Sequence, residues 1–309
     1  MKSLLFAALL SILCIGSKAS AGLHEGVEAY QKGDYRLAIQ ELSPLARQGD
    51  RYAQLCLGVM YLDGGHGVQQ DDEQATKWLR LAADQGDDLA QVSLGHFYSK
   101  RDHEEAAKWF RLAAEQGTAS AQRELALLYF NGTRFPEGEF VAKGTGLVPR
   151  DDKEAAKWFR LAAEQGDDLG QVNLGVIYAN GKGVAQDYKE AVKWFRLAAD
   201  QGSSSAQRNL GAMFVYGKGV PENRVAACAL LDLAVAAGAK TDGSLTELHG
   251  LLPQTMTKNE IKASLALTQQ MAEPGNLLKA LDQYVKSTVT QQHRDTGLIT
   301  NPMGRHKQK

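Results

Sequence analysis

The sequence predicts an all-α protein, a solenoid built from repeated pairs of helices. A ten-residue block that begins Lys-Trp and ends Gln-Gly, at 77–86, recurs with small changes at 108–117, 157–166 and 193–202. Each copy holds one of the four tryptophans of the chain. The glycines that close successive units are spaced by 31 to 49 residues, at positions 49, 86, 117, 166, 202 and 238. Spacings of this size are typical of α-helical repeat proteins.

Composition excludes several classes of protein. The chain has 309 residues, of which 44% are hydrophobic and 23% charged, so it has enough apolar side chains to form a core. Its 35 basic residues are balanced by 36 acidic ones, which leaves no basic field to attract a nucleic acid. We therefore expect no nucleic-acid partner.

The first 21 residues have the pattern of a signal peptide. A short basic start, Met1-Lys2, precedes a twelve-residue apolar run and the small residues Ala19, Ser20 and Ala21. We expect cleavage near Ala21 and an exported protein, periplasmic or secreted. The run is too short to span a bilayer, and no later stretch is long enough, so no membrane span is expected. Lipidation at Cys14 is disfavoured because Leu13 stands where a small residue is required.

Residues 22–50 are interpreted as a partial repeat that caps the N-terminus, and 53–238 as five full units. In each unit the first helix carries Ala, Leu and Tyr at helical spacing, as Ala53, Leu57 and Tyr61 do. The second helix begins after an aspartate that stands three residues before Gln or Glu, the spacing of a capping box. These aspartates are Asp71, Asp102, Asp151 and Asp187.

The repeated pattern resembles the Sel1-like repeat family, a relative of the tetratricopeptide repeats. This resemblance implies a right-handed superhelix of antiparallel helix pairs that binds protein partners, and an exported bacterial protein. Two departures stand out: the third unit has no glycine loop between Tyr98 and Asp102, and the fourth carries about 13 extra residues around 133–145. A cysteine-rich branch of the family, associated with β-lactam binding or hydrolysis, has paired cysteines that this chain lacks.

The last unit differs at positions that are polar in the others. Ala229, Asp232 and Ala237 stand where earlier units have Lys, Arg and Gln, which predicts that a further element covers this helix. We expect capping helices within 239–289, one of them started by a capping box of Thr257 and Glu260. Residues 290–309 are interpreted as a mobile tail.

No catalytic motif was found. The glycine loops at 181–184 and 217–220 end in Gly-Lys-Gly-Val, without the Ser or Thr of a phosphate loop. The histidines are scattered, although His96 and His103 could share an ion. Cys56 and Cys228 lie in apolar helical patterns and are read as buried residues, and the tryptophans as core. We therefore expect a non-enzymatic protein with no metal and no cofactor.

Side chains that differ between units mark the candidate binding surface. Three columns of the first helices lie on one side, where a protein or peptide could be recognised by hydrogen bonds, although such positions could also be merely solvated. We call the first helix of each repeat its A helix and the second its B helix, and we call this set of positions the A-helix face. Its polar and aromatic members are Asp63, Ser93, His96, Lys100, Glu124, Asn131, Asn173, Asn180, Asn209 and Tyr216. Phe135 and Phe140 of the insertion are candidates as well, either as anchors for a partner or packed on the solenoid.

The function expected from these observations is that of an exported, monomeric scaffold that binds a protein partner. Two alternatives stay open at this point. One is a cell-wall enzyme of the β-lactamase type, and the other is a module that binds peptidoglycan or another polysaccharide.

Overall fold

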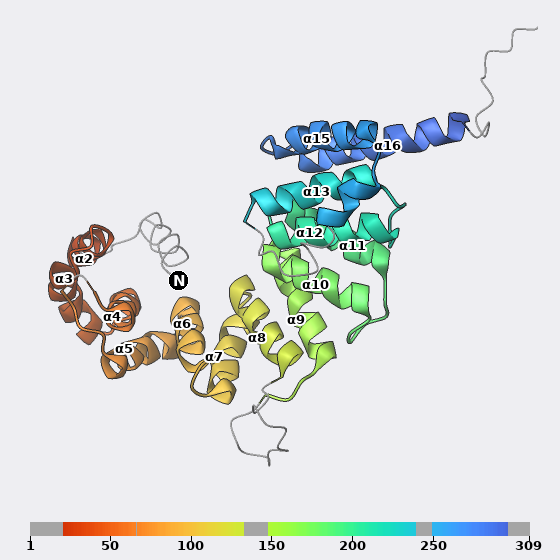
Figure 1. Cartoon of the computed structure of the whole chain (residues 1–309). Helices are drawn as coiled ribbons and strands as arrows, with labels where there is room; N and C mark the ends of the chain where they lie inside the picture. The colour runs from red at the N-terminus through yellow and green to blue at the C-terminus, as the bar shows by residue number, and fades with distance from the viewer. Residues whose placement is uncertain (1–20, 66, 133–147, 239–248, 296–309) are drawn as a thin grey trace, which may run out of the picture. The chain divides into compact units, whose positions relative to one another are not determined.

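A computed structural model describes residues 21–65, 67–132, 148–238 and 249–295, and within these ranges every named element is a helix (Figure 1). The predicted signal peptide, the insertion with Phe135 and Phe140, and residues 296–309 of the predicted tail lie outside the described residues. The chain divides into two compact units, Met1–Trp158 and Phe159–Lys309, which are described in turn.

Unit 1 is a series of helices in which each packs on the next in the sequence. Its helices are α2 (Ala21–Gln31), α3 (Tyr35–Arg47), α4 (Arg51–Asp63), α5 (Asp72–Asp84), α6 (Asp88–Tyr98), α7 (His103–Glu115) and α8 (Ala119–Asn131). Helix α9 (Asp152–Glu164) contains the boundary between the two units. Helices α2 and α3 form a helix pair over the residues interpreted as the N-terminal capping repeat.

Unit 2 begins with helix pairs like those of unit 1 and ends with helices that do not belong to a repeat. Its helices are α10 (Asp168–Asn180), α11 (Tyr188–Asp200), α12 (Ser204–Tyr216), α13 (Arg224–Ala236), the short 3-10 helix η1 (Leu252–Thr255), α15 (Lys258–Ala272) and α16 (Leu277–Asp295). Helix α15 packs on α13, and α16 contacts α15, α13 and α11. Helix α16 runs six residues beyond the predicted end at 289.

The helix starts predicted from aspartates are confirmed. A side-chain oxygen of Asp71 accepts a hydrogen bond from the backbone N–H of Gln74 at 2.9 Å, and Asp102 and Asp187 cap α7 and α11 in the same way. Thr257 and Glu260 form the predicted capping box, in which each side chain bonds the backbone N–H of the other. Each such cap satisfies N–H groups that have no partner within the helix.

The third repeat, which contains α6 and α7, has a tight turn between its two helices, as its missing glycine loop predicts. Only four residues separate α6 from α7, and the backbone N–H groups of Arg101 and Asp102 both donate to the carbonyl of Tyr98, at 2.8 and 2.7 Å. The A and B helices of this unit are therefore joined without the extended segment that other units place before the B helix.

The core lies between the two helices of each pair. Phe110 of α7 is 1% exposed and packs against Gly95 of α6, where a Cβ atom would lie 2.5 Å from the phenyl ring. Phe195 and Gly175 repeat this contact in unit 2. The tryptophans sit one position earlier, and the expectation that all four are core holds only in part. Trp158 and Trp194 are buried, but Trp78 and Trp109 are half-buried.

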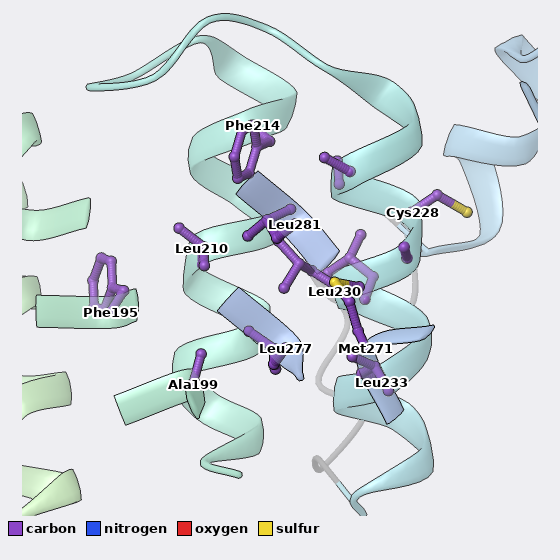
Figure 2. Packing of buried hydrophobic residues seen from close by; sticks show 14 of the residues in the cluster. Phe195, Ala199, Leu210, Phe214, Cys228, Leu230, Leu233, Met271, Leu277 and Leu281 are labelled. Carbon is purple, nitrogen blue, oxygen red and sulfur yellow. The ribbon is translucent and has the colours of Figure 1, made fainter. Parts of the chain in front are cut away.

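The C-terminal helices cover the last pair, in agreement with the expectation drawn from its altered positions. Leu277 and Leu281 of α16 and Met271 of α15 join Phe214 and Leu230 in one buried cluster (Figure 2). The charge-reversed Asp232 of α13 has a specific partner here, because its carboxylate lies 2.8 Å from the imidazole of His249. The segment after the last repeat thus supplies the groups that the next repeat would otherwise provide.

Candidate protein-binding surface

A ladder of hydrogen-bonded glutamines, built on a buried glutamine of each A helix, joins successive repeats. In unit 1, Gln54 donates to the carbonyl of Ala46 at 2.9 Å and accepts a bond of 2.8 Å from Gln85, the residue that ends the next B helix. Gln116 donates to Gln91 in the same way at 2.7 Å, and in unit 2 Gln201 donates to Gln171 at 2.9 Å. Buried amides are stable only when hydrogen-bonded, so these positions are committed to stacking.

A second ladder joins an arginine of the B helices α5, α7 and α9 to a tyrosine of the following A helix. Arg80 donates from Nη2 to the hydroxyl of Tyr98 at 2.7 Å, with its guanidinium 5.8 Å from the ring centre. Arg111 bonds Tyr129 likewise, and within unit 2 Arg160 bonds Tyr178. Sequence reasoning did not identify these pairs, although a constant separation of 18 residues between Arg and Tyr was visible in the repeats.

The A-helix face of unit 1 is less open than the helical spacing suggests. Ser93 is only 5% exposed, and its hydroxyl donates to the carbonyl of Leu89 in its own helix. His96 is half-buried with its ring edge-on to Phe110. Helices α4 and α6 contact each other, so stacking of adjacent units covers this side. Ser93 therefore offers no group to a partner.

The remaining members in unit 1 differ in exposure. Asp63 and Glu124 are half-buried, and Glu124 is held by an ion pair of 3.0 Å with the neighbouring Arg123. Lys100 and Asn131 are exposed, Lys100 in the turn that follows α6 and Asn131 at the C-terminal end of α8. The open part of the face is thus its edge near the A–B loops.

Unit 2 shows the same distribution. Asn173 and Asn209 are half-buried, and the side chain of Asn173 donates to the carbonyl of Leu169 in its own helix at 2.8 Å. Asn180 and Tyr216, the last residues of α10 and α12, are exposed. Tyr216 is 60% exposed, an unusually high value for an aromatic side chain.

Tyr216 belongs to a cluster of aromatic and basic groups beside the loop that follows α12. The ammonium group of Lys218 lies 5.2 Å from the ring centre of Tyr188 and 5.9 Å from that of Tyr216. Gly219 of this loop has a φ of 74° and packs closely on the backbone of α11. Only glycine fits this position, because a Cβ atom there would lie 2.3 Å from the carbonyl oxygen of Tyr188. Gly-Lys-Gly-Val predicts a turn at this place, but no pattern in the sequence pointed to Tyr188 and Lys218 as neighbours of Tyr216.

The two described thiols are unsuited to nucleophilic chemistry. Both are unbonded to another cysteine and buried. Burial raises the pKa of Cys56 to about 12, and burial followed by the charge of Asp232 raises the pKa of Cys228. A thiol is reactive as its thiolate, so both stay in the unreactive form near neutral pH. Among the described residues, no three His, Cys, Asp or Glu side chains are grouped to hold a metal ion.

Comparison with known families agrees with the repeat pattern. The Sel1 repeat profile matches six segments, at 51–87, 88–118, 119–137, 138–167, 169–203 and 204–238. The chain belongs to the Sel1 repeat family, whose repeats generally form scaffolds for protein–protein interaction. The third and fourth segments contain α8 and α9, which are the A and B helices of one unit with the insertion between them.

Solved structures with the same fold include two of bacterial origin. A protective antigen present in uropathogenic Escherichia coli strains, which displays an SLR fold, is 29% identical with a TM-score of 0.70. That match covers 93% of this chain, which spans only 58% of the antigen's length. A Sel1 repeat protein from Oxalobacter formigenes is 29% identical with a TM-score of 0.65, over 81% of this chain and 96% of that protein. No curated protein sequence matches the chain.

None of the described helices combines the length and the apolar character that crossing a bilayer requires.

Proposed function

We propose that this protein is an exported, monomeric, non-enzymatic scaffold that binds a protein partner through the loop edge of its A-helix face. The principal contact in this proposal is the group formed by Tyr216, Lys218 and Tyr188, with Asn180 in the equivalent position of the preceding unit. Tyrosines that are exposed and already fixed in place are frequent energetic centres of protein interfaces.

The observation that carries the proposal is the contrast between the ladders and this edge. The Gln–Gln and Arg–Tyr pairs recur from unit to unit, so they stabilise stacking and cannot distinguish one unit from another. Tyr216 is one of a kind at its position, because the equivalent residues are Asp63, Lys100, Asn131 and Asn180. Selective binding requires such a difference.

Site-specific photocrosslinking tests the proposal directly. A photoreactive phenylalanine analogue is placed at Tyr216 in one variant and at Leu197, an exposed residue of the B helix α11, in the other. Expressed in cells of the source organism, the variant at 216 should yield a discrete crosslinked protein that the variant at 197 does not. Equal crosslinking from both positions, or none from 216, would contradict the proposed edge.

Export and the absence of catalysis are tested separately. Mass spectrometry of the protein from the cell envelope should give a mature N-terminus close to Gly22, whereas an intact Met1 would contradict export. The similarity to a protein described as a protective antigen is in keeping with the proposed export. Hydrolysis of a chromogenic β-lactam by the folded protein, above the rate of a heat-unfolded sample, would contradict the non-enzymatic scaffold.

A further inference from the structure

A groove of about 560 Å³ lies on the B-helix side of unit 1. One wall is α7, which contributes Ala107, Arg111 and Leu112. Tyr129 of α8 and the segment containing Val148 and Pro149, just before α9, form the other wall. Glu104 and Lys108 of α7 also line the groove and pair with each other at 3.6 Å, so the groove combines an apolar surface with the guanidinium group of Arg111.

The same groove occurs in unit 2, where part of the chain fills it. Counted from the starts of their helices, six positions of unit 2 correspond to the residues of the apolar walls and Arg111. They are Val192, Arg196 and Leu197 of α11, Phe214 of α12, and the pair Val220 and Pro221. Helix α16 contacts α11 and α13 and thereby covers these positions. The kind of segment that fits such a groove can therefore be read from α16.

Two kinds of contact hold α16. Leu277 and Leu281 are buried in the same cluster as Phe214 (Figure 2). Val192 belongs to this cluster as well. Asp282, next to Leu281, lies 2.7 Å from Nη2 of Arg196. The apolar and acidic groups of α16 thus match the apolar floor and the arginine of the groove.

From this equivalence we infer that the groove of unit 1 binds an amphipathic helix of a partner protein, one that presents leucines four residues apart and an adjacent acidic residue. Its leucines pack on Tyr129 and Val148, and its carboxylate pairs with Arg111. Arg111 already donates to the hydroxyl of Tyr129, but a guanidinium has five N–H donors and accommodates a carboxylate as well. Recognition of a helix by an apolar groove is a common binding mode.

This inference is independent of the proposed function. It concerns α7, α8 and the segment before α9 in unit 1, and none of the residues around Tyr216. Either surface can fail its test without affecting the other.

The probe is a fluorescein-labelled synthetic peptide of residues 276–290, the part of α16 that carries Leu277, Leu281 and Asp282. Its binding to the full mature protein is followed by fluorescence anisotropy. We expect saturable binding that weakens about five- to tenfold in Arg111→Gln, because a charge-assisted hydrogen bond is lost. The peptide with Asp282→Asn should show a similar loss against the parent protein and little further loss against Arg111→Gln.

Arg80→Gln is the matched control. Arg80 bonds Tyr98 as Arg111 bonds Tyr129, but the tight turn after α6 gives it no counterpart of Val148 and Pro149. This variant should bind the peptide with parental affinity. A third variant, Arg196→Gln, reports whether the peptide merely exchanges with the native α16.

The outcomes separate cleanly. Weaker binding in Arg111→Gln, with parental affinity in Arg80→Gln and Arg196→Gln, supports the groove of unit 1. No saturable binding, equal affinity in Arg111→Gln and parent, or a loss confined to Arg196→Gln would overturn the inference. Circular dichroism of each variant confirms that the helices are retained.

Discussion

The side-chain amide of Gln85 donates a hydrogen bond of 2.8 Å to Oε1 of Gln54. This bond links the C-terminal end of the second helix of a repeat, α5, to the first helix of the same repeat, α4. The same bond is formed by Gln116 with Gln91 and by Gln201 with Gln171, whereas in the last repeat Ala237 occupies the position of the donor. Oε1 of Gln207 is consequently buried without a partner among the described residues. The ladder therefore holds the units together and ends at a definite residue.

Removing a central member of the ladder should destabilise the protein. Gln171 donates to the carbonyl of Ala163 and accepts from Gln201, so Gln171→Ala removes both hydrogen bonds and leaves the amide of Gln201 without this acceptor. We expect a loss of about 1–3 kcal/mol in the free energy of unfolding, measured by urea denaturation. Gln186→Ala, at an exposed glutamine of the same unit, is the control. Equal midpoints for these two variants would argue against a stabilising ladder.

Restoring the missing donor should have the opposite effect. The backbone at Ala237, with φ of −79° and ψ of 9°, is nearly that of Gln201, at −79° and 2°. Ala237→Gln can therefore place its amide near Gln207 and should raise the stability of unit 2 by about 0.5–1.5 kcal/mol. The double variant Ala237→Gln with Gln207→Leu should lose this gain. If the gain persists without Gln207, the new glutamine acts in some other way.

Trp194 should respond very differently to Ala and to Phe. It is 7% exposed, and its indole N–H is buried with no hydrogen-bond partner in the described part of the chain. Trp194→Ala removes a large packed side chain and should cost about 3–5 kcal/mol of unfolding free energy. Trp194→Phe keeps much of the packing and removes the unpaired donor, so its loss should stay below about 1.5 kcal/mol. Similar losses in the two variants, determined by chemical denaturation, would show that packing is not the main role of this position.

His96 should make the protein less stable in mild acid. Burial lowers its pKa, an effect that Arg123 reinforces and Glu124 opposes, while the ring of Phe110 packs against it. Below about pH 6.5 the unfolded chain then binds a proton that the folded chain does not, so unfolding becomes easier as the pH falls. The effect of one such proton is at most about 1.4 kcal/mol per pH unit.

The comparison for this prediction is His96→Gln. Urea denaturation at pH 7.5 and 5.5 should show a larger loss of stability in the parent than in the variant. A variant that loses as much as the parent would assign the acid sensitivity to other groups.

Much of the fold was predictable because repetition reveals the local signals several times over. The helix starts at Asp71 and Asp102, the tight turn after Tyr98 and the capping box at Thr257 are each fixed by a few neighbouring residues. The existence of a covering element followed from Asp232, although its partner His249 did not. Local chemistry is readable in one sequence when its partners are three or four residues away.

The candidate surface was less predictable because its exposure depends on the neighbouring unit. Ser93 lies on the outer side of an isolated helix wheel but is buried once α4 packs against α6. The tryptophans were predicted to fill the core, but beside Gly95 the buried residue is Phe110, and the adjacent Trp109 is half-buried. Phe135 and Phe140 lie outside the described residues and remain predictions.

The division between stacking positions and binding positions is tested most directly by Tyr216→Ala. Once the protein crosslinked at position 216 is identified, titration calorimetry measures its affinity for the parent and the variant, and urea denaturation measures their stability. The side chain is 60% exposed and forms no core contact, so the midpoint of unfolding should change by no more than about 0.5 kcal/mol. Affinity should fall at least tenfold, the loss expected of an aromatic contact worth about 1.4 kcal/mol or more. Unchanged affinity in a folded variant would contradict the account.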